Sequence, residues 1–274
     1  MSGVTAEAQQ RGEVLMPSMG EPTILVVNHP LISDPGLFRP IVENRGYAIE
    51  EVDYSLDQRP ARPIGEYAAM VVMGGSPQVD EEDKHPWLVT EKAAIREAVD
   101  NGTPYLGVCF GAQLLADVAG GVVRPATVPR HGWGDVVRCG GADGDPVFGG
   151  LPTVFRTVVW QHYEIECPPN ATQMARSATA LHGFRIDGKP AWGTQFHPEA
   201  GPVEIRSWID SLNSVDEITS DAAELVLAEA EVYHRQQLLL SDTICGAFLR
   251  VVDERSNASQ LRLGASNCEL SIDD

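Results

Sequence analysis

One cysteine of the chain stands between two glycines, where a short apolar run gives way to a second one. The stretch from Thr103 to Gly121 reads TPYLGVCFGAQLLADVAGG and places Cys109 between Gly107 and Gly111. This pattern is the form of a nucleophile elbow, in which flanking glycines relieve the crowding of a sharp strand-to-helix turn. A helix that begins there offers a positive dipole end, which favours a thiolate, and free backbone N–H groups for an oxyanion. The pattern therefore predicts a nucleophile at Cys109 rather than an inert core sulfur.

A second motif, WGTQFHPEA at 192–200, offers a base for this thiol. A nucleophilic thiol needs a base, and the base needs a group that orients it. His197 follows a predicted strand and Glu199 stands two residues further on. Residues two apart in an extended segment point the same way, so Glu199 can reach the far nitrogen of the His197 ring. Cys109, His197 and Glu199 are therefore the predicted catalytic triad.

A glycine pair supplies the third part of the predicted site. Gly74 and Gly75 follow an apolar run at 68–73. A loop with two glycines lets the backbone approach a ligand closely. The N–H groups of Gly75 and Phe110 can then act together as an oxyanion hole.

The elements that must position these groups alternate between strand and helix over the first half of the chain. Strands are expected at 23–28, 47–53, 68–73 and 104–108, and helices around 35–45, 86–100 and directly after Cys109. This alternation predicts an α/β fold, flavodoxin-like and doubly wound, with a mostly parallel sheet and helices on both faces. Because parallel strands bring their carboxyl ends to one edge, the predicted site residues should meet there.

The rest of the chain changes character twice. Short strand candidates separated by Gly, Pro and Asn fill 122–196, and a helical pattern follows at 202–252. We predict a flexible N-terminal segment at 1–22, one domain at 23–252 that includes those C-terminal helices, and a polar acidic tail at 253–274.

The composition argues against several classes of protein. The 274 residues carry a formal net charge of −19, which would repel nucleic acid, and the sequence has no signal-like or membrane-spanning apolar run. We therefore expect a cytoplasmic protein with neither nucleic acid nor membrane as a partner. The five cysteines form no C-x-x-C pair and the histidines no H-x-x-x-H cluster, so no metal and no other cofactor is expected.

Four segments together carry a resemblance to a known family: VVMGGSPQVD, PYLGVCFGAQLLA, VVWQHYE and GTQFHPE. They resemble the class I glutamine amidotransferase domains, and within them the free-standing branch similar to the GMP synthase amidotransferase domain. The resemblance covers roughly 23–250, and the motifs occur in the family's order. It implies that Cys109 attacks the side-chain amide of glutamine to form a γ-glutamyl thioester. His197 would protonate the departing ammonia, and Glu199 would orient His197.

The resemblance also implies the groups that bind the substrate. Gln113, one helical turn after the nucleophile, matches the family's glutamine-binding position. The backbone around His162, Tyr163 and Glu164 matches the segment that holds the amino-acid end of the substrate. Here the chain departs from the family, which commonly has a small residue where Tyr163 stands, and a bulky ring could reshape the pocket for another γ-glutamyl compound.

Three functions remain in competition. No synthetase domain or phosphate-binding loop follows in this sequence, so a glutaminase would deliver ammonia to a separate synthetase or biosynthetic enzyme. The first alternative is a self-sufficient hydrolase of γ-glutamyl peptides or conjugates, which needs no partner. The second is a non-catalytic regulatory or scaffold protein, which the intact Cys109, His197 and Glu199 disfavour. An esterase of the α/β-hydrolase fold is disfavoured because its triad runs in a different order.

Overall fold

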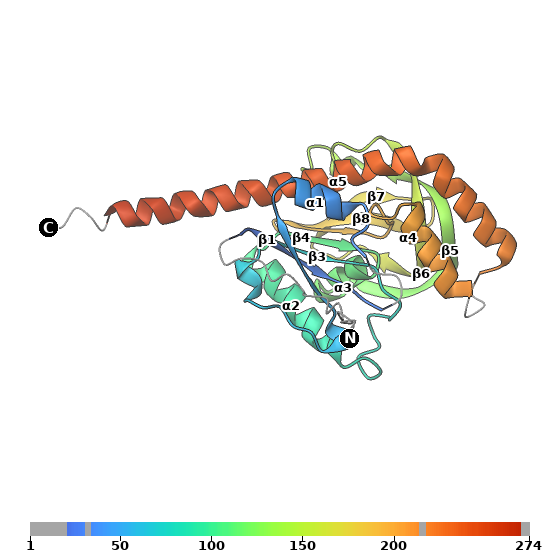
Figure 1. The fold of residues 1–274 in the computed structure, drawn as a ribbon, viewed down its shortest axis with the longest axis horizontal. Coiled ribbons are helices and arrows are strands. Elements are labelled where there is room, and N and C mark those ends of the chain that lie inside the picture. The colour runs from blue at the N-terminus through green and yellow to red at the C-terminus, as the bar shows by residue number, and fades with distance from the viewer. Residues whose placement is uncertain (1–20, 31–33, 214–217, 270–274) are drawn as a thin grey trace, which may run out of the picture.

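A nine-stranded sheet runs through the molecule (Figure 1). The structure, a computed structural model, describes residues 21–30, 34–213 and 218–269. The strand order is β2-β1-β3-β4-β9-β8-β7-β5-β6. The strands are β1 (Thr23–Val27), β2 (Ala48–Val52), β3 (Ala69–Val72), β4 (Tyr105–Val108), β5 (Val122–Arg138), β6 (Val154–Glu166), β7 (Ala171–Arg176), β8 (Leu181–Ile186) and β9 (Ala191–Thr194).

The sheet has a parallel half and an antiparallel half. Strands β2, β1, β3, β4 and β9 pair in parallel, and the remaining pairings, from β9 to β8 onward, are antiparallel. The predicted α/β fold is confirmed, and the parallel half contains every strand expected before Cys109. The sheet was expected to be mostly parallel, but the antiparallel half makes the whole sheet mixed. Strands β4 and β9 are neighbours, so their carboxyl ends bring Cys109 and His197 to the same edge.

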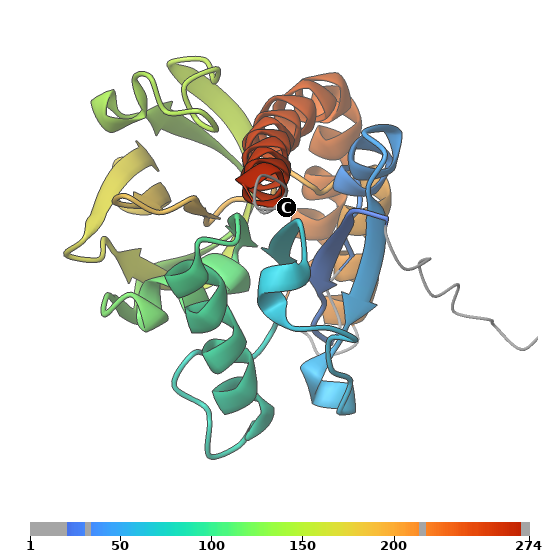
Figure 2. The ribbon, with the colours of Figure 1, turned by 90° about the vertical axis from the view of Figure 1, so that its left-hand side faces the viewer.

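Helices cover both faces of the parallel half, as expected for a doubly wound sheet. The helices are α1 (Phe38–Asn44), α2 (Trp87–Asn101), α3 (Phe110–Val118), α4 (Pro202–Asn213) and α5 (Ser220–Glu269). Along β1, Ile24 and Val26 join a core cluster with α1 and α5, whereas Leu25 and Val27 join a second cluster with α2 and α3. Successive side chains of a strand point to opposite faces, so a strand buried on both sides reads as a continuous apolar run. Figure 2 shows the two helix layers on either side of the strands.

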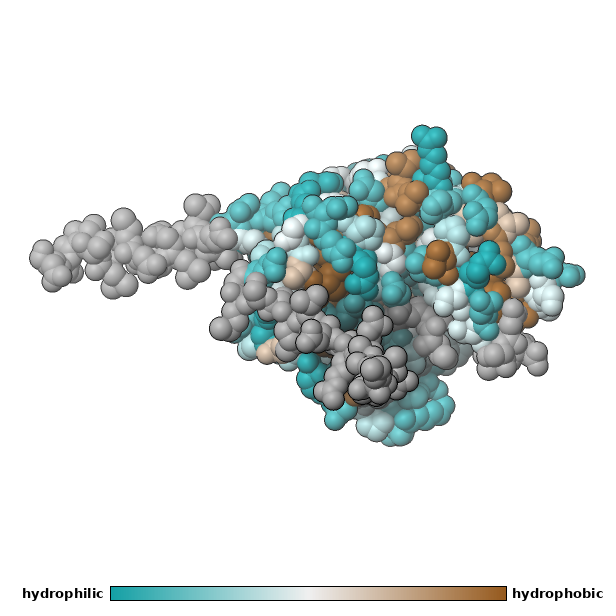
Figure 3. Space-filling view, in the orientation of Figure 1, coloured by the Kyte–Doolittle hydropathy of each residue, from teal (hydrophilic) through white to brown (hydrophobic). Residues whose placement is uncertain are grey.

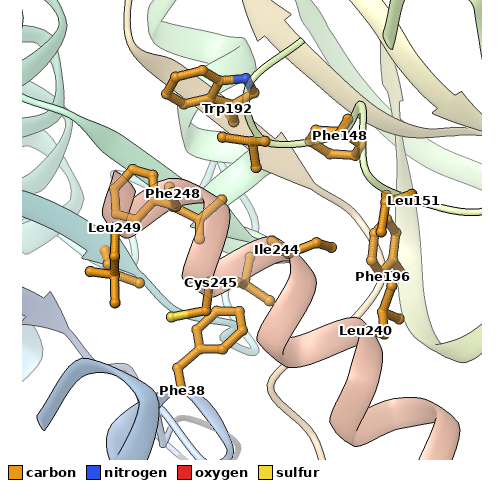
Figure 4. Packing of buried hydrophobic residues seen from close by; sticks show 14 of the residues in the cluster. Phe38, Phe148, Leu151, Trp192, Phe196, Leu240, Ile244, Cys245, Phe248 and Leu249 are labelled. Carbon is orange, nitrogen blue, oxygen red and sulfur yellow. The ribbon is translucent and has the colours of Figure 1, made fainter. Parts of the chain in front are cut away.

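Helix α5 is part of the core over much of its length. Figure 4 shows Cys245 and Phe248 of α5 packed between Phe38 of α1 and Trp192 of β9. The helix continues to Glu269 and extends away from the sheet (Figure 1). It therefore runs through most of the segment expected as a polar tail. The expected N-terminal segment lies largely outside the described residues, and the division into domain and tail stays a prediction.

The long strand β5 is not evident from the sequence as one element. Its 17 residues include prolines and glycines, which break the alternation that identifies a strand. It pairs with β6 along two stretches, and the register shifts between Pro125 and Arg130. A bulge of this kind accommodates residues that a regular ladder excludes.

Apolar side chains also gather on the surface over α4 and α5, on the right of Figure 3. The exposed residues there include Val203, Leu225, Val232 and Leu239. Within the described part of the chain, no helix has both the length and the apolar character needed to cross a membrane.

Candidate active site

Cys109 lies at the bend between β4 and α3 in a strained backbone conformation. Its φ is 49° and its ψ is −102°, outside the regions that L-residues commonly occupy. Such strain costs about 1–3 kcal/mol and persists only where the surrounding structure enforces it. The nucleophile elbow predicted from the sequence is thus present in the backbone, with Cys109 directly before the first turn of α3.

The two flanking glycines allow close backbone approach at this bend. A Cβ on Gly107 would lie 2.5 Å from the backbone of Gly111, and a Cβ on Gly111 would lie 2.1 Å from the carbonyl oxygen of Val72 in β3. Neither position has room for a side chain, because the neighbouring atoms belong to the backbone. The start of α3 can therefore pack directly against the sheet.

His197 and Glu199 form a buried pair directly after β9. His197 Nδ1 lies 2.8 Å from Glu199 Oε1, and the two residues are 0% and 1% exposed. A carboxylate accepts, so Nδ1 carries the proton and Nε2 is the nitrogen directed away from Glu199. Burial alone lowers the pKa of His197, but the charges of Glu199 and Cys109 outweigh it and raise that pKa to about 10.

His197 and Cys109 both lie beside Gly74, where a side chain would come between them. A Cβ on Gly74 would lie 3.1 Å from His197 Cε1 and 3.7 Å from Cys109 Cβ. His197 Nε2 is buried, and the interaction with the Cys109 side chain is one of the causes that raise the pKa of His197. The ring of Trp208 lies 4.6 Å from the His197 ring and limits its movement.

The two segments that carry the predicted oxyanion donors are in contact. A Cβ on Gly75 would approach Phe110 Cδ1 to 2.9 Å, so the glycine loop and the start of α3 are in contact. Within the described residues, neither the Gly75 N–H nor the Phe110 N–H donates to an acceptor. Backbone N–H groups that are free of other acceptors are what an oxyanion hole requires.

The contacts of the sulfur identify two residues that sequence reasoning passed over. Cys109 Sγ donates to the Trp160 carbonyl oxygen at 3.4 Å and accepts from Gln195 Nε2 at 3.5 Å. Gln195 Oε1 in turn accepts from Gln113 Nε2 at 3.1 Å, which connects the predicted substrate-binding Gln113 to the nucleophile. Beside Trp160, Gln161 is 3% exposed and its Oε1 has no partner in the described structure. Gln161 and Gln195 both stand inside motifs that the sequence analysis quoted, VVWQHYE and WGTQFHPEA. The signal that could have identified them is a polar residue within an otherwise apolar strand segment.

The other predicted binding residues have partners elsewhere. His162 Nε2 lies 3.1 Å from His131 Nε2, and Glu164 forms an ion pair with Arg124 at 3.1 Å. Tyr163 is half-buried. No described side-chain contact connects these three residues to Cys109, and the backbone of the same strand reaches Cys109 through Trp160 instead.

Helix α5 contributes a further residue behind His197. Gln237 is 1% exposed, and its Nε2 donates to the His197 carbonyl oxygen at 2.5 Å. Its Oε1 accepts from the Thr157 hydroxyl at 3.3 Å. The described residues include no group of three or more His, Cys, Asp and Glu side chains that could hold a metal ion.

Comparison with known proteins places these motifs in a family. The sequence model described as "Glutamine amidotransferase class-I" matches residues 39–208. One subunit of the glutamine-hydrolyzing GMP synthase of Thermoplasma acidophilum is 33% identical over 135 residues, which are 47% of this chain and 62% of that relative. The glutamine-hydrolyzing GMP synthase of Thermomicrobium roseum is 34% identical over 142 residues, 51% of this chain and 25% of that protein. The chain thus spans less than two thirds of each of these relatives.

A solved structure extends the likeness over most of the fold. The crystal structure of a glutamine amidotransferase from Thermotoga maritima has a TM-score of 0.76 to this chain at 27% identity. The likeness covers 85% of this chain and 98% of that one.

Proposed function

The chain belongs to the class I glutamine amidotransferase family, and we propose that it hydrolyses the side-chain amide of glutamine through a thioester on Cys109. The observation that carries this proposal is the strained Cys109 beside the buried His197–Glu199 pair. Backbone strain and the burial of charged groups each cost stability, and their coincidence at one thiol is typical of a catalytic site.

The first half of the proposed reaction forms the thioester. The Cys109 thiolate attacks the amide carbon, and the amide oxygen becomes an oxyanion held by the N–H groups of Gly75 and Phe110. The carbon–nitrogen bond then breaks, and the departing nitrogen takes a proton from Nε2 of His197 and leaves as ammonia. Glu199 keeps the imidazolium in place through Nδ1.

The second half of the reaction releases glutamate. His197, now neutral, takes a proton from a water molecule that attacks the thioester carbon. The carbon–sulfur bond breaks and restores the thiolate. Gln113 and the backbone of Trp160 through Glu164 are the proposed holders of the glutamine. Because Gln195 bonds both Gln113 and Cys109, we add it to the proposed binding set.

The ammonia acceptor in this proposal is a separate synthetase or biosynthetic enzyme. The support comes from the two GMP synthase relatives. The first is one subunit of its enzyme, and the second is a longer protein, of which this chain matches 25%. The half-buried Tyr163 favours one other function, the self-sufficient hydrolysis of a γ-glutamyl peptide or conjugate, because its ring stands where the family commonly has a small residue.

Glutamate release tests the proposal. The purified protein and its Cys109→Ala variant are given glutamine and a panel of γ-glutamyl amides and peptides. Release that depends on Cys109 and favours glutamine supports the glutaminase. Rapid Cys109-dependent release from a γ-glutamyl peptide, with glutamine poor, identifies the self-sufficient hydrolase instead. Equal release by both proteins, or no release together with no labelling of Cys109 by a glutamine-like electrophile, contradicts the thioester mechanism.

A further inference from the structure

A second buried histidine–glutamate pair lies behind the proposed oxyanion hole. His29 follows β1 and Glu91 lies on α2, and they are 4% and 0% exposed. His29 Nε2 is 2.9 Å from Glu91 Oε1, and His29 Nδ1 is 2.9 Å from the Gly74 carbonyl oxygen. Neither residue belongs to the proposed triad or to the proposed glutamine-binding set.

The two partners fix the protonation of the His29 ring. A carbonyl oxygen only accepts, so Nδ1 carries a hydrogen, and a carboxylate also accepts, so Nε2 carries one as well. Burial lowers the pKa of His29, but the charge and hydrogen bond of Glu91, with the hydrogen bond of Gly74, outweigh it and raise that pKa. The raised pKa favours the imidazolium form of the ring, and both of its nitrogens are paired, one with Gly74 and one with Glu91.

The same ring touches both segments that supply oxyanion donors. It packs edge-on against the ring of Phe110, with centroids 5.0 Å apart. A Cβ on Gly75 would lie 2.9 Å from His29 Cγ and 2.9 Å from Phe110 Cδ1, so Gly75 sits in a slot between the two rings. Trp87, at 5.9 Å, lies near the same ring. A shift of His29 would therefore move both the glycine loop and the start of α3.

We propose that His29, held by Glu91, is a positioning residue that fixes and polarises the peptide between Gly74 and Gly75. The Gly74 carbonyl and the Gly75 N–H belong to one peptide group. A charged donor on the carbonyl oxygen draws electron density from the amide, and chains of hydrogen bonds strengthen one another in this way. The Gly75 N–H thus becomes a better donor to the oxyanion. This inference rests on the proposed function, because it assigns the N–H groups of Gly75 and Phe110 to that reaction.

Two substitutions at His29 separate this role from simple packing. In His29→Asn the side-chain amide can still donate to the Gly74 oxygen, since its nitrogen stands near the position of Nδ1. In His29→Leu the site stays filled but the donor is lost. Tyr67→Phe is the matched control, because it removes a hydrogen bond of 2.6 Å to Glu50 from a residue of the core cluster that also contains Phe110.

The kinetic readout is glutamate release with kcat and KM measured separately. We expect His29→Leu to lower kcat by about 10-fold to 10²-fold, less than the 10²-fold to 10³-fold that follows loss of a whole oxyanion donor. KM should change by less than about threefold, because the interaction strengthens in the transition state. His29→Asn should recover most of the lost rate, and Tyr67→Phe should keep the wild-type rate. Equal kcat in wild type and His29→Leu, or an equal loss in both His29 variants, would overturn the inference.

An independent readout does not need turnover. With glycine labelled by carbonyl ¹³C and amide ¹⁵N, a carbonyl–amide correlation spectrum reports only Gly–Gly peptides, which occur at 74–75, 120–121, 140–141 and 149–150. We expect His29→Leu to move the 74–75 signal and leave the other three, and His29→Asn to move it less. A 74–75 signal that stays in place overturns the inference even if wild type proves inactive. Wild-type inactivity by itself counts against the proposed function.

Discussion

Adding one methyl group at Gly111 tests whether the elbow depends on direct contact between α3 and the sheet. The new Cβ would lie 2.1 Å from the Val72 carbonyl oxygen and 2.7 Å from the Val72 carbonyl carbon. Carbon–oxygen contacts need at least about 3 Å, so the start of α3 must move by roughly 1 Å, because a backbone carbonyl in a central strand cannot rotate away. Overpacking of this kind typically costs 1–3 kcal/mol, and we expect Gly111→Ala to lie near the upper value, at about 3 kcal/mol.

Two measurements follow from this displacement. A loss of about 3 kcal/mol in a domain of this size lowers the melting temperature by about 6–12 °C. A misplacement of about 1 Å near a reacting centre can cost 10²-fold in rate, so glutamate release should fall by about that factor even where the protein is folded. Thermal unfolding and kcat of Gly111→Ala are measured beside wild type.

Gly134→Ala is the matched control, because no heavy atom lies within 4 Å of the added Cβ. It should leave the melting temperature and the rate close to the wild-type values. If Gly111→Ala has the same melting temperature as Gly134→Ala and keeps the wild-type rate, the close approach of α3 to β3 is not what holds Cys109 in place.

Two other substitutions address the supports of the site, and a third tests a buried acceptor in the core. Glu199→Gln removes the charge that raises the pKa of His197, so kcat should fall by about 10²-fold to 10⁴-fold with the circular dichroism spectrum unchanged. The raised pKa of His197 also stabilises the fold. This contribution is complete below the unfolded-state pKa of 6.5 and is lost as the pH rises toward about 10. Urea unfolding from pH 6 to pH 9.5 should therefore show a falling free energy of unfolding in wild type and a flatter profile in Glu199→Gln. Gln237→Leu leaves the buried His197 carbonyl without its donor, which should cost about 1–3 kcal/mol in urea unfolding and lower kcat more than KM. Asp145→Ala removes the acceptor of two backbone N–H groups and of the Trp192 indole, so it should destabilise the protein by about 3 kcal/mol without a selective effect on kcat.

The first half of the fold could be predicted because its signals are local. Three of the four expected strands, β1, β3 and β4, are short apolar runs buried on both faces, whereas β2 is only partly buried. The elbow at Cys109 could also be predicted, since two glycines at a strand–helix junction have few other uses. By contrast, β5 is a strand whose bulge accommodates residues that normally break strands, and only its pairing with β6 reveals it.

The supports of the site could not be predicted in the same way, because they depend on contacts between residues far apart in the chain. His29 and Glu91 are separated by 62 positions, and Gln237 and His197 by 40. Taken singly, each is an ordinary polar residue near the end of a strand or on a helix. Burial identifies them, because a polar group without access to water must find a partner, and here the partners are backbone groups of the site.

Helix α5 shows how far such supports extend beyond the motifs. The family match ends at residue 208, before α5 begins at Ser220. Yet α5 supplies Gln237 to the His197 carbonyl, and its first turns pack in one cluster with Trp160 and Trp208. Trp208 lies against the His197 ring, and the Trp160 carbonyl accepts from Cys109. A change in the position of α5 must therefore act on both proposed catalytic side chains together, which makes this helix a structural part of the proposed active site.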